Sequence, residues 1–306
     1  MKNDRSQLKT CAITGAGGFV GGRLKAHLQH CGWRIIEWTR QPAPGSNVVP
    51  FQLGQTIDPH SLTGVGALVH CAYDFAPSRW KYIEAINITG SERLFQAARA
   101  AGVAKIVCIS SLSAFAGCRS LYGKAKLRIE DLAGNLGAFV IRPGLVYGDI
   151  PGGIFGRLVG QARSSRFVPL LSGCAQTQYL IHDEDLAELV CRCLNGQVSP
   201  AGGPIAAAHP QAWQLQEILA RIAQALGRRI SFVPVPWRLV WTALKMLETI
   251  SLPARFRSDS LIGMVYQDPN PSFAVLASLG VQCRPFALTP GMLERRETSF
   301  EQGHNP

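Results

Sequence analysis

The residues of this chain that could do chemistry begin with a tyrosine and a lysine four positions apart, Tyr122 and Lys126. On a helix this spacing puts both side chains on one face, where they can converge on one substrate atom. A tyrosine hydroxyl has a reference pKa of about 10, and a cation held beside it lowers that pKa toward the range a proton-transfer catalyst needs. Ser111, eleven residues earlier, adds a hydroxyl that can orient and polarise a substrate oxygen. On spacing alone, a core aromatic residue beside a solvated amine is an equally good interpretation.

A glycine-rich turn near the N-terminus could hold a phosphorylated cofactor. Residues 9–14 form an apolar run that predicts a buried strand, and glycines at 15, 18 and 21 lead from it into a helix-like segment through Leu24 and Leu28. A helix N-terminus offers free N–H groups and a partial positive charge to a pyrophosphate. The spacing differs from G-x-G-x-x-G because position 20 is Val, and a glycine-rich connection without a ligand stays open as the alternative.

Alternating strand-like and helix-like segments must position these residues. Strands are predicted at 9–14, 33–39, 48–51, 66–72, 105–110 and 138–142, and helices at 20–31, 78–101 and 120–134. This order predicts an α/β fold whose parallel sheet carries helices on both faces, with ligand bound at the carboxyl ends of the strands. Gly15, His70, Ser111 and Pro143 all fall at such ends, so four segments can line one crevice. We expect His70 to be a satisfied strand-end residue rather than an acid or base.

Further motifs follow these elements in order: Val69-His70-Cys71-Ala72, Asn87-Ile-Thr-Gly90, Ile106-Val-Cys-Ile-Ser110-Ser111, Ile141-Arg142-Pro143-Gly144-Leu-Val-Tyr147-Gly148 and Ile181-His182-Asp-Glu-Asp185. Over residues 10 to 190 the chain resembles an extended short-chain dehydrogenase/reductase, of the NAD-dependent epimerase/dehydratase family. The resemblance implies an enzyme with a Rossmann-type doubly wound parallel sheet and a smaller C-terminal substrate lobe. We therefore expect a dinucleotide-binding domain at 1–145, to which 175–200 returns, and a substrate lobe with a C-terminal tail over 146–306.

The resemblance also implies roles for individual residues. Tyr122 would transfer the proton of a substrate hydroxyl or carbonyl, Lys126 would also hydrogen-bond the nicotinamide ribose, and Asn87 would support the lysine. Ser113 competes with Ser111 as the active-site serine. Asp185 is more simply explained by a capping box with Glu188 that starts a helix. The predicted cofactor-binding residues are Gly15, Gly18, Phe19, Val20, Gly21, Thr39, Arg40, Cys71, Ala72, Asn87, Ser110, Tyr122, Lys126, Pro143, Gly144 and Val146.

The end of the second predicted strand bears on the choice of cofactor. An acidic residue there binds the adenosine ribose of NAD, whereas an arginine accommodates the 2′-phosphate of NADP. This chain has Thr39 and Arg40, which favours NADP with Arg40 as the phosphate partner. Glu37 leaves NAD open, and a solvated Arg40 is the other alternative.

The chain departs from the resembling family at positions that bear on the substrate. Leu112 and Ser113 stand where 4,6-dehydratases have Asp-Glu, so a dehydratase is not expected. Gln178 stands where many sugar-nucleotide enzymes have an arginine for the substrate pyrophosphate, although Arg157, Arg163 or Arg166 could compensate. Hydride transfer at a secondary alcohol or ketone carbon of a nucleotide-linked sugar is the leading hypothesis. The alternatives are NADPH-dependent reduction of a free carbonyl or hydroxysteroid-like apolar compound and, less favoured, a non-catalytic dinucleotide sensor.

Composition limits the remaining function classes. The 306 residues are 47% hydrophobic, enough for a substantial core, and contain no run of about 20 apolar residues that predicts a membrane span. The start is polar and unlike a signal peptide, so we expect a cytoplasmic protein. Nine scattered cysteines indicate neither a disulfide nor a metal site. A net charge of +11 with dispersed cations fits a small anionic ligand better than nucleic acid, and a homodimer is compatible with the sequence.

Between residues 213 and 250 the sequence predicts two helices separated by Ser231–Pro236. The second carries Trp237, Val240, Trp241, Leu244 and Leu247 on one face. Packing within the lobe is the favoured explanation of this stripe, with a lipid-facing or substrate-facing role as the alternative.

Overall fold

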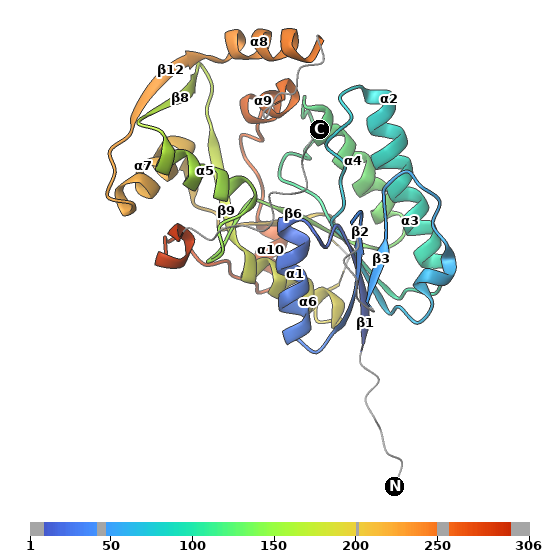
Figure 1. The fold of residues 1–306 in the computed structure, drawn as a ribbon. Coiled ribbons are helices and arrows are strands. Elements are labelled where there is room, and N and C mark those ends of the chain that lie inside the picture. Colours follow the sequence, from blue (N-terminus) through green and yellow to red (C-terminus); the bar gives the residue numbers. More distant parts are fainter. Residues whose placement is uncertain (1–8, 42–46, 200–201, 250–256, 295–306) are drawn as a thin grey trace.

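A seven-stranded parallel sheet forms the centre of the protein. Figure 1 shows the fold in a computed structural model. The structure describes residues 9–41, 47–199, 202–249 and 257–294. In spatial order the strands are β10 (Ile205–Ala207), β6 (Phe139–Pro143), β5 (Lys105–Ile109), β4 (Ala67–His70), β1 (Thr10–Thr14), β2 (Arg34–Thr39) and β3 (Val48–Pro50). All six pairings are parallel. The predicted Rossmann-type sheet is therefore confirmed, and β10 is a strand that the sequence analysis did not assign.

Helices cover both faces of this sheet. One face carries α1 (Phe19–His30) and α6 (Asp183–Leu194). The other carries the short α2 (Trp80–Ile83), a π-helical turn at Glu84–Ile88, α3 (Thr89–Ala100) and α4 (Leu121–Gly134). A 3-10 turn at Pro59–Leu62 precedes β4. Because both faces are covered, the inner strands are almost continuously apolar.

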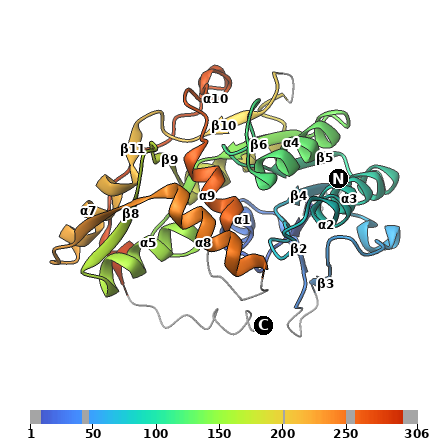
Figure 2. The same cartoon turned by 90° about the horizontal axis from the view of Figure 1, so that it is seen from above.

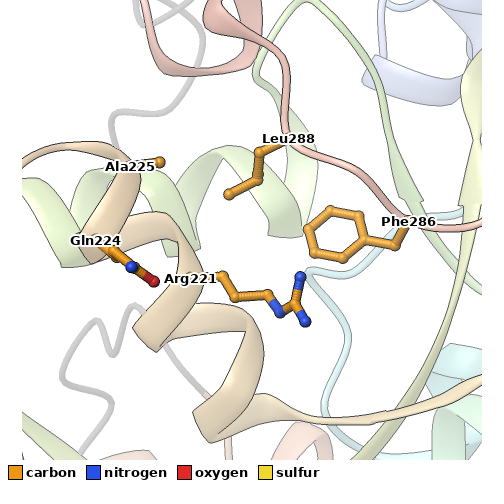
Figure 3. A pocket seen from close by; sticks show the side chains of 5 residues that line it. All are labelled: Arg221, Gln224, Ala225, Phe286 and Leu288. Atoms are coloured by element: carbon orange, nitrogen blue, oxygen red, sulfur yellow. The ribbon is translucent and has the colours of Figure 1, made fainter.

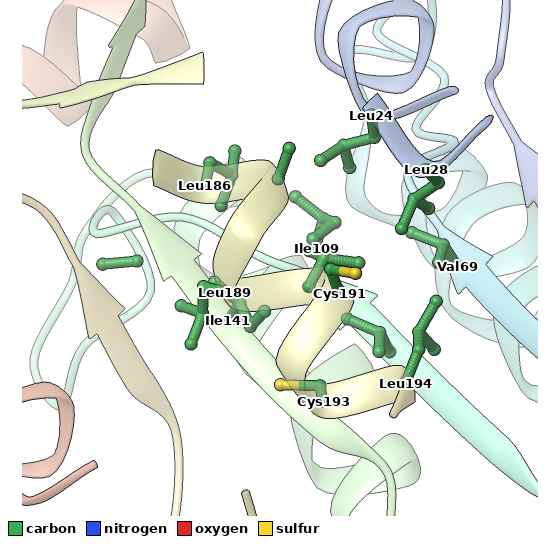
Figure 4. Close-up of a cluster of buried hydrophobic side chains, with 14 of the residues drawn as sticks. Leu24, Leu28, Val69, Ile109, Ile141, Leu186, Leu189, Cys191, Cys193 and Leu194 are labelled. Atoms are coloured by element: carbon green, nitrogen blue, oxygen red, sulfur yellow. The ribbon is translucent and has the colours of Figure 1, made fainter. Parts of the chain in front are cut away.

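The hydrophobic core consists of two layers separated by the sheet. Between the sheet and the α1–α6 pair, side chains from five elements interdigitate (Figure 4): Leu24, Leu28, Val69, Ile109, Ile141, Leu186, Leu189, Cys191, Cys193 and Leu194. Cys191 and Cys193 are buried free thiols of this layer. The other layer lies under α3 and α4 and contains Trp38, Leu68, Leu94, Phe95 and Ile129. Packing on both faces fixes where each strand ends, and the functional loops start from those ends.

The second half of the chain forms a smaller lobe beside the carboxyl ends of the strands. Its elements are β7 (Leu145–Tyr147), α5 (Gly153–Ser164), β8 (Phe167–Ser172), β9 (Thr177–His182), β11 (Ala212–Gln214), α7 (Leu215–Ala225), β12 (Ser231–Pro236), α8 (Trp237–Thr249), α9 (Ser258–Val265) and a 3-10 turn at Pro290–Leu293. They form a sheet of order β11-β9-β7 and a parallel pair of β12 and β8. Figure 2 shows α8 and α9 reaching from this lobe over the strand ends.

The chain returns to the central sheet three times after leaving it, through α6, through β10 and through α10 (Ala274–Ser278), which packs on β10. The capping box predicted at Asp185 is wrong: α6 begins at Asp183, and the His182 ring accepts the Glu184 N–H at 3.3 Å. Asp185 instead accepts bonds from the backbone and guanidinium of Arg284, both at 2.8 Å. The poorly ordered tail predicted for the last twenty residues is wrong in its first part, because Pro290–Leu293 forms a 3-10 turn and Met292 is buried. The rest of that prediction, residues 295–306, lies outside the described residues.

Candidate active site

The glycine turn between β1 and α1 is shaped by how closely its backbone packs. Gly15 adopts φ +69°, and a Cβ on it would lie 3.0 Å from the Ala72 backbone. A Cβ on Gly21 would lie 2.3 Å from the Gly15 carbonyl oxygen, so only glycine lets α1 approach the turn this closely. Gly18 is the N-cap and provides no side chain to cap α1, so the first helical N–H groups face the turn. This backbone cradle fits the pyrophosphate of a dinucleotide.

The other predicted cofactor residues lie along the same edge of the sheet. Thr39 ends β2 close to the turn, because a Cβ on Gly17 would meet its hydroxyl at 3.1 Å, and the exposed Arg40 follows it. Phe19 packs beneath Gly152 at the start of α5. Six more lie at or after the ends of β4, β5 and β6. Cys71 and Ala72 follow β4, Ser110 follows β5, Pro143 ends β6, Gly144 follows it and Val146 lies in β7. The structure therefore brings the predicted residues to one edge, as expected for a dinucleotide site.

A buried chain of hydrogen bonds sets the loop after β4. Thr14 Oγ1 accepts the Ala72 N–H at 3.3 Å and lies 2.7 Å from His70 Nδ1, while His70 Nε2 lies 2.9 Å from Ser91 Oγ. The Ser91 hydroxyl donates to the Asn87 carbonyl at 2.6 Å, so it must accept from Nε2–H. Burial, and secondarily Lys126, lowers the pKa of His70 to about 3, which keeps the ring neutral. His70 is thus a satisfied strand-end residue, as predicted.

Asn87 fixes the next part of this loop. Its Oδ1 accepts the Asp74 N–H at 2.7 Å, and its Nδ2 donates to the Asp74 carbonyl at 3.0 Å. The amide therefore holds the segment that carries Tyr73 and Phe75. The support of Lys126 by Asn87 stays a prediction.

Tyr122 and Lys126 occupy the first turns of α4. The Lys126 side chain is 3% exposed, its Nζ donates to the Ile109 carbonyl at 2.9 Å, and it lies 5.2 Å from the Tyr73 ring centroid. The Tyr122 ring packs edge-on against Tyr73 at 4.9 Å and stacks on Phe75 at 5.6 Å. Burial raises the pKa of Tyr73 further above its ordinary value, so Tyr73 is a neutral aromatic wall.

The two candidate serines follow β5. Ser111 Oγ accepts the Ser113 N–H at 3.1 Å, which leaves its own hydrogen free to donate. The Ser113 backbone packs on α4, because a Cβ on Gly123 would lie 2.4 Å from the Ser113 carbonyl oxygen. The hydroxyl of Ser110 points elsewhere and donates to Glu130, which also holds Arg142 through two nitrogens.

The sequence of this chain matches the profile of the NAD dependent epimerase/dehydratase family over residues 11–205. The chain belongs to this family. It is an enzyme of the NAD-dependent epimerase/dehydratase type, as the resemblance implied.

Individual relatives differ in how much of the chain they match. A ceramide reductase from Caulobacter vibrioides is 28% identical over 283 residues, which cover 87% of this chain and 87% of that protein. A sterol-4-alpha-carboxylate 3-dehydrogenase (decarboxylating) from Mus musculus is 27% identical, over 37% of this chain and 33% of that protein. Among solved structures, gox2253 is 21% identical with a TM-score of 0.67, over 91% of this chain and 94% of that chain. MoeE5 in complex with UDP-glucose and NAD is 20% identical with a TM-score of 0.64, over 84% of this chain and 97% of that chain. These structures share the fold.

In this family member the C-terminal lobe contributes residues on both sides of Tyr122 that the sequence analysis missed. The Asp259 carboxylate, from the first turn of α9, accepts the N–H groups of Leu121 at 2.6 Å and Tyr122 at 3.0 Å. Arg257, two residues earlier, donates to the carbonyls of Phe75 at 2.5 Å and Ala76 at 2.9 Å. No local motif marks either residue, because the partners lie 138 and 182 positions away.

The candidate site has an aromatic wall beside Tyr122. Phe75 is 64% exposed beside Tyr122, and Tyr73 lies behind both rings. The sequence analysis missed Tyr73, although an aromatic residue directly after the strand predicted at 66–72 could have marked it. Burial raises the pKa of Tyr147 to about 12, and its hydroxyl donates to the Pro285 carbonyl at 3.3 Å, so Tyr147 is structural here.

The lobe also has a shallow pocket away from these residues (Figure 3). It is lined by Arg221, Gln224, Ala225, Phe286 and Leu288, where α7 meets the segment after Cys283. The Arg221 guanidinium lies over the Trp213 ring at 4.4 Å. Within the part of the chain that the structure describes, no group of three or more His, Cys, Asp or Glu side chains could hold a metal ion.

Proposed function

We propose that this enzyme is an NAD(P)H-dependent reductase that acts on the ketone of a ceramide-like amphipathic lipid. The observation that carries the proposal is the aromatic wall of Tyr73 and the exposed Phe75 against Tyr122. An alkyl chain beside a ketone gains free energy by leaving water for such a surface, whereas a sugar diphosphate does not. The similarity to a ceramide reductase supports it, because it extends over 87% of both chains and so includes the substrate lobe.

Three residues, Tyr122, Lys126 and Ser111, would each have one task in the reduction. The new C–H bond at the carbonyl carbon would come from the hydride that a reduced nicotinamide supplies when it is bound at the glycine turn. The Tyr122 hydroxyl donates the proton that the carbonyl oxygen takes up, and the Lys126 ammonium stabilises the resulting phenolate. Ser111 donates a hydrogen bond to the same oxygen and polarises the carbonyl before transfer. Solvent then returns a proton to the phenolate.

NADPH is the proposed cofactor. The Glu37 carboxylate is bound to Lys25 Nζ at 3.1 Å, so it is engaged by α1 rather than available to a ribose. Arg40 is exposed one residue beyond Thr39, at the edge of the glycine turn. An arginine at this position suits a 2′-phosphate through charge-assisted hydrogen bonds.

Conversion of a nucleotide-linked sugar is the second candidate. Solved structures with the same fold hold UDP-glucose with NAD, which favours it. The absence of an arginine at Gln178 counts against it, and Arg163 is already engaged by the Leu293 carbonyl. A non-catalytic dinucleotide sensor is the least supported, because it would not need Tyr122 and Lys126. A homodimer and a cytoplasmic location stay predictions.

Cofactor stoichiometry separates the candidates. The purified enzyme is given NADPH and a short-chain N-acyl amino ketone in detergent micelles, and the loss of reduced nicotinamide is compared with the alcohol formed. We expect one NADPH oxidised for each alcohol, and faster turnover with NADPH than with NADH. Interconversion of UDP-glucose without added cofactor, with no reduction of the ketone, would contradict the proposal and favour the sugar candidate.

A further inference from the structure

Helix α8 carries one apolar stripe that packs onto the protein. Trp237, Val240, Trp241 and Leu244 are partly buried, and the Trp237 ring contacts Tyr266 edge-on at 6.0 Å. None of the thirteen residues of α8 is fully buried. Leu247, seven residues after Val240, lies at the edge of this stripe and is 37% exposed.

A second apolar stripe on α8 faces away from the protein. Leu239 and Met246 are 66% and 65% exposed, and the exposed Ala243 lies between them at the i, i+4, i+7 spacing of one helical face. Single exposed apolar residues are ordinary, but a stripe of them along one helix marks an interaction surface. We call Leu239, Ala243, Met246 and Leu247 the outer stripe.

Two cations lie along one side of the outer stripe. Arg238 and Lys245 are exposed and seven residues apart, so they lie on one line along the helix, and the Arg238 guanidinium is 5.6 Å from the Trp237 ring centroid. Lys245 also bonds Glu248 at 3.4 Å, on the side that packs inward. The chain as a whole carries a net charge of +11. An exposed apolar stripe bordered by Lys and Arg is the pattern of a helix that lies in the surface of an anionic bilayer.

Hydrogen bonds connect α8, the helix that carries the outer stripe, to the loop beside Tyr122. Glu248, at the end of α8, accepts the N–H and the hydroxyl of Ser258, both at 2.8 Å. The neighbouring Arg257 holds the carbonyl of Phe75, the exposed aromatic residue beside Tyr122. Figures 1 and 2 show α8 on the outside of the molecule, over α9. A surface that binds the outer stripe therefore lies on the outer side of a helix that is bonded, through Ser258 and Arg257, to the loop of Phe75.

We propose that the outer stripe docks onto the surface of an anionic lipid bilayer and presents the active-site mouth to lipid substrates. The proposal rests on the proposed function, because an amphipathic ketone resides in the bilayer. No described helix is long and apolar enough to cross a membrane, and thirteen residues at about 1.5 Å each suit a helix that lies in the plane. The flanking cations favour an anionic bilayer over a second copy of this basic chain.

Flotation with lipid vesicles tests the docking without using activity. Wild-type protein is mixed with vesicles of equal parts phosphatidylcholine and phosphatidylglycerol, or of phosphatidylcholine alone. We expect binding to the mixed vesicles that weakens at high salt, and a loss of about tenfold or more in Leu239→Gln/Met246→Gln, which leaves the net charge unchanged. The matched control is Phe167→Gln, which removes an equally exposed apolar side chain at the far end of the β8–β12 pair and should bind like wild type.

Other outcomes overturn the proposal. The first is that the wild-type protein binds neither kind of vesicle, and the second is that the double variant binds as well as wild type. The third is that the wild-type protein sediments as a dimer and does not bind vesicles, whereas the double variant sediments as a monomer. Reduction of a micelle-dispersed short-chain ketone should be unchanged in Leu239→Gln/Met246→Gln. Vesicle binding by a protein that fails to reduce any ketone would support the docking surface and contradict only the proposed function.

Discussion

Replacing Asp259 by alanine should both destabilise the protein and impair catalysis, because this carboxylate caps the helix that carries Tyr122. It accepts the first two N–H groups of α4, at 2.6 and 3.0 Å, while Ser120 accepts the Gly123 N–H at 3.1 Å. Loss of a helix cap costs about 1 kcal/mol, and loss of an anion at a helix N-terminus adds about 0.5 kcal/mol. We therefore expect Asp259→Ala to lower the free energy of unfolding by about 1.5 kcal/mol, and Asp259→Asn, which keeps an acceptor, by less.

The catalytic effect of Asp259→Ala should be larger than its effect on binding. A first turn that frays moves the Tyr122 hydroxyl, and a displacement of about 1 Å can cost up to about a hundredfold in rate. We expect kcat for ketone reduction to fall about tenfold or more while the Kd for NADPH stays within about twofold. Thermal unfolding, steady-state kinetics and cofactor titration measure the three quantities. The matched control is Asp268→Ala, because Asp268 accepts only the nearby Asn270 N–H. If Asp259→Ala behaves like this control in both stability and kcat, the cap does not position Tyr122.

Four further predictions follow from the site. Tyr122→Phe should retain NADPH affinity and lose most turnover, since it removes the proton donor and little volume; equal turnover would disprove its role. Arg40→Ala should raise the KM for NADPH about tenfold or more and leave that for NADH nearly unchanged. Glu130→Ala should destabilise the protein by about 3 kcal/mol because it leaves Arg142 unpaired, and an additional Arg142→Leu should restore part of that loss in chemical unfolding. Burial lowers the pKa of His70 from 6.5 to about 3, so between these pH values the unfolded chain binds a proton at His70 that the folded protein does not. Lowering the pH from 6.5 to 3 should therefore reduce the free energy of unfolding by up to about 1.4 kcal/mol per pH unit, and His70→Asn should make this dependence on pH less steep.

The central sheet could be predicted because its strands are buried on both faces and so appear as separate apolar runs. Six strands and three helical regions lie where the sequence placed them, within a few residues. The seventh strand, β10, is only three residues long, and its pairing with β6 is set by packing in the assembled sheet. A run this short carries no period that distinguishes it from a loop.

Helix starts were less predictable because a capping signal does not tell which of two caps is used. Asp185 and Glu188 have capping-box spacing, yet His182 caps α6 and Asp185 binds Arg284, 99 residues away. Tertiary contacts decide which residue caps the helix. The Asp185 carboxylate forms a stronger, charge-assisted bond with a guanidinium than it would with a local backbone N–H. At α4 the structure shows two caps that the sequence analysis did not identify, Ser120 and, from the other lobe, Asp259.

Contacts between residues far apart in the sequence hold Tyr122 in place in the candidate site. Tyr122, Lys126 and the glycine turn belong to the sheet domain, and their order along the chain was sufficient to find them. What holds Tyr122 against its aromatic neighbours comes from one short segment of the other lobe, since Asp259 binds the start of α4 and Arg257 binds the loop of Phe75. Both sides of Tyr122 are therefore bonded to the segment next to α8. In the proposed mechanism, the smaller lobe thus fixes the position of a proton donor that the sheet domain carries.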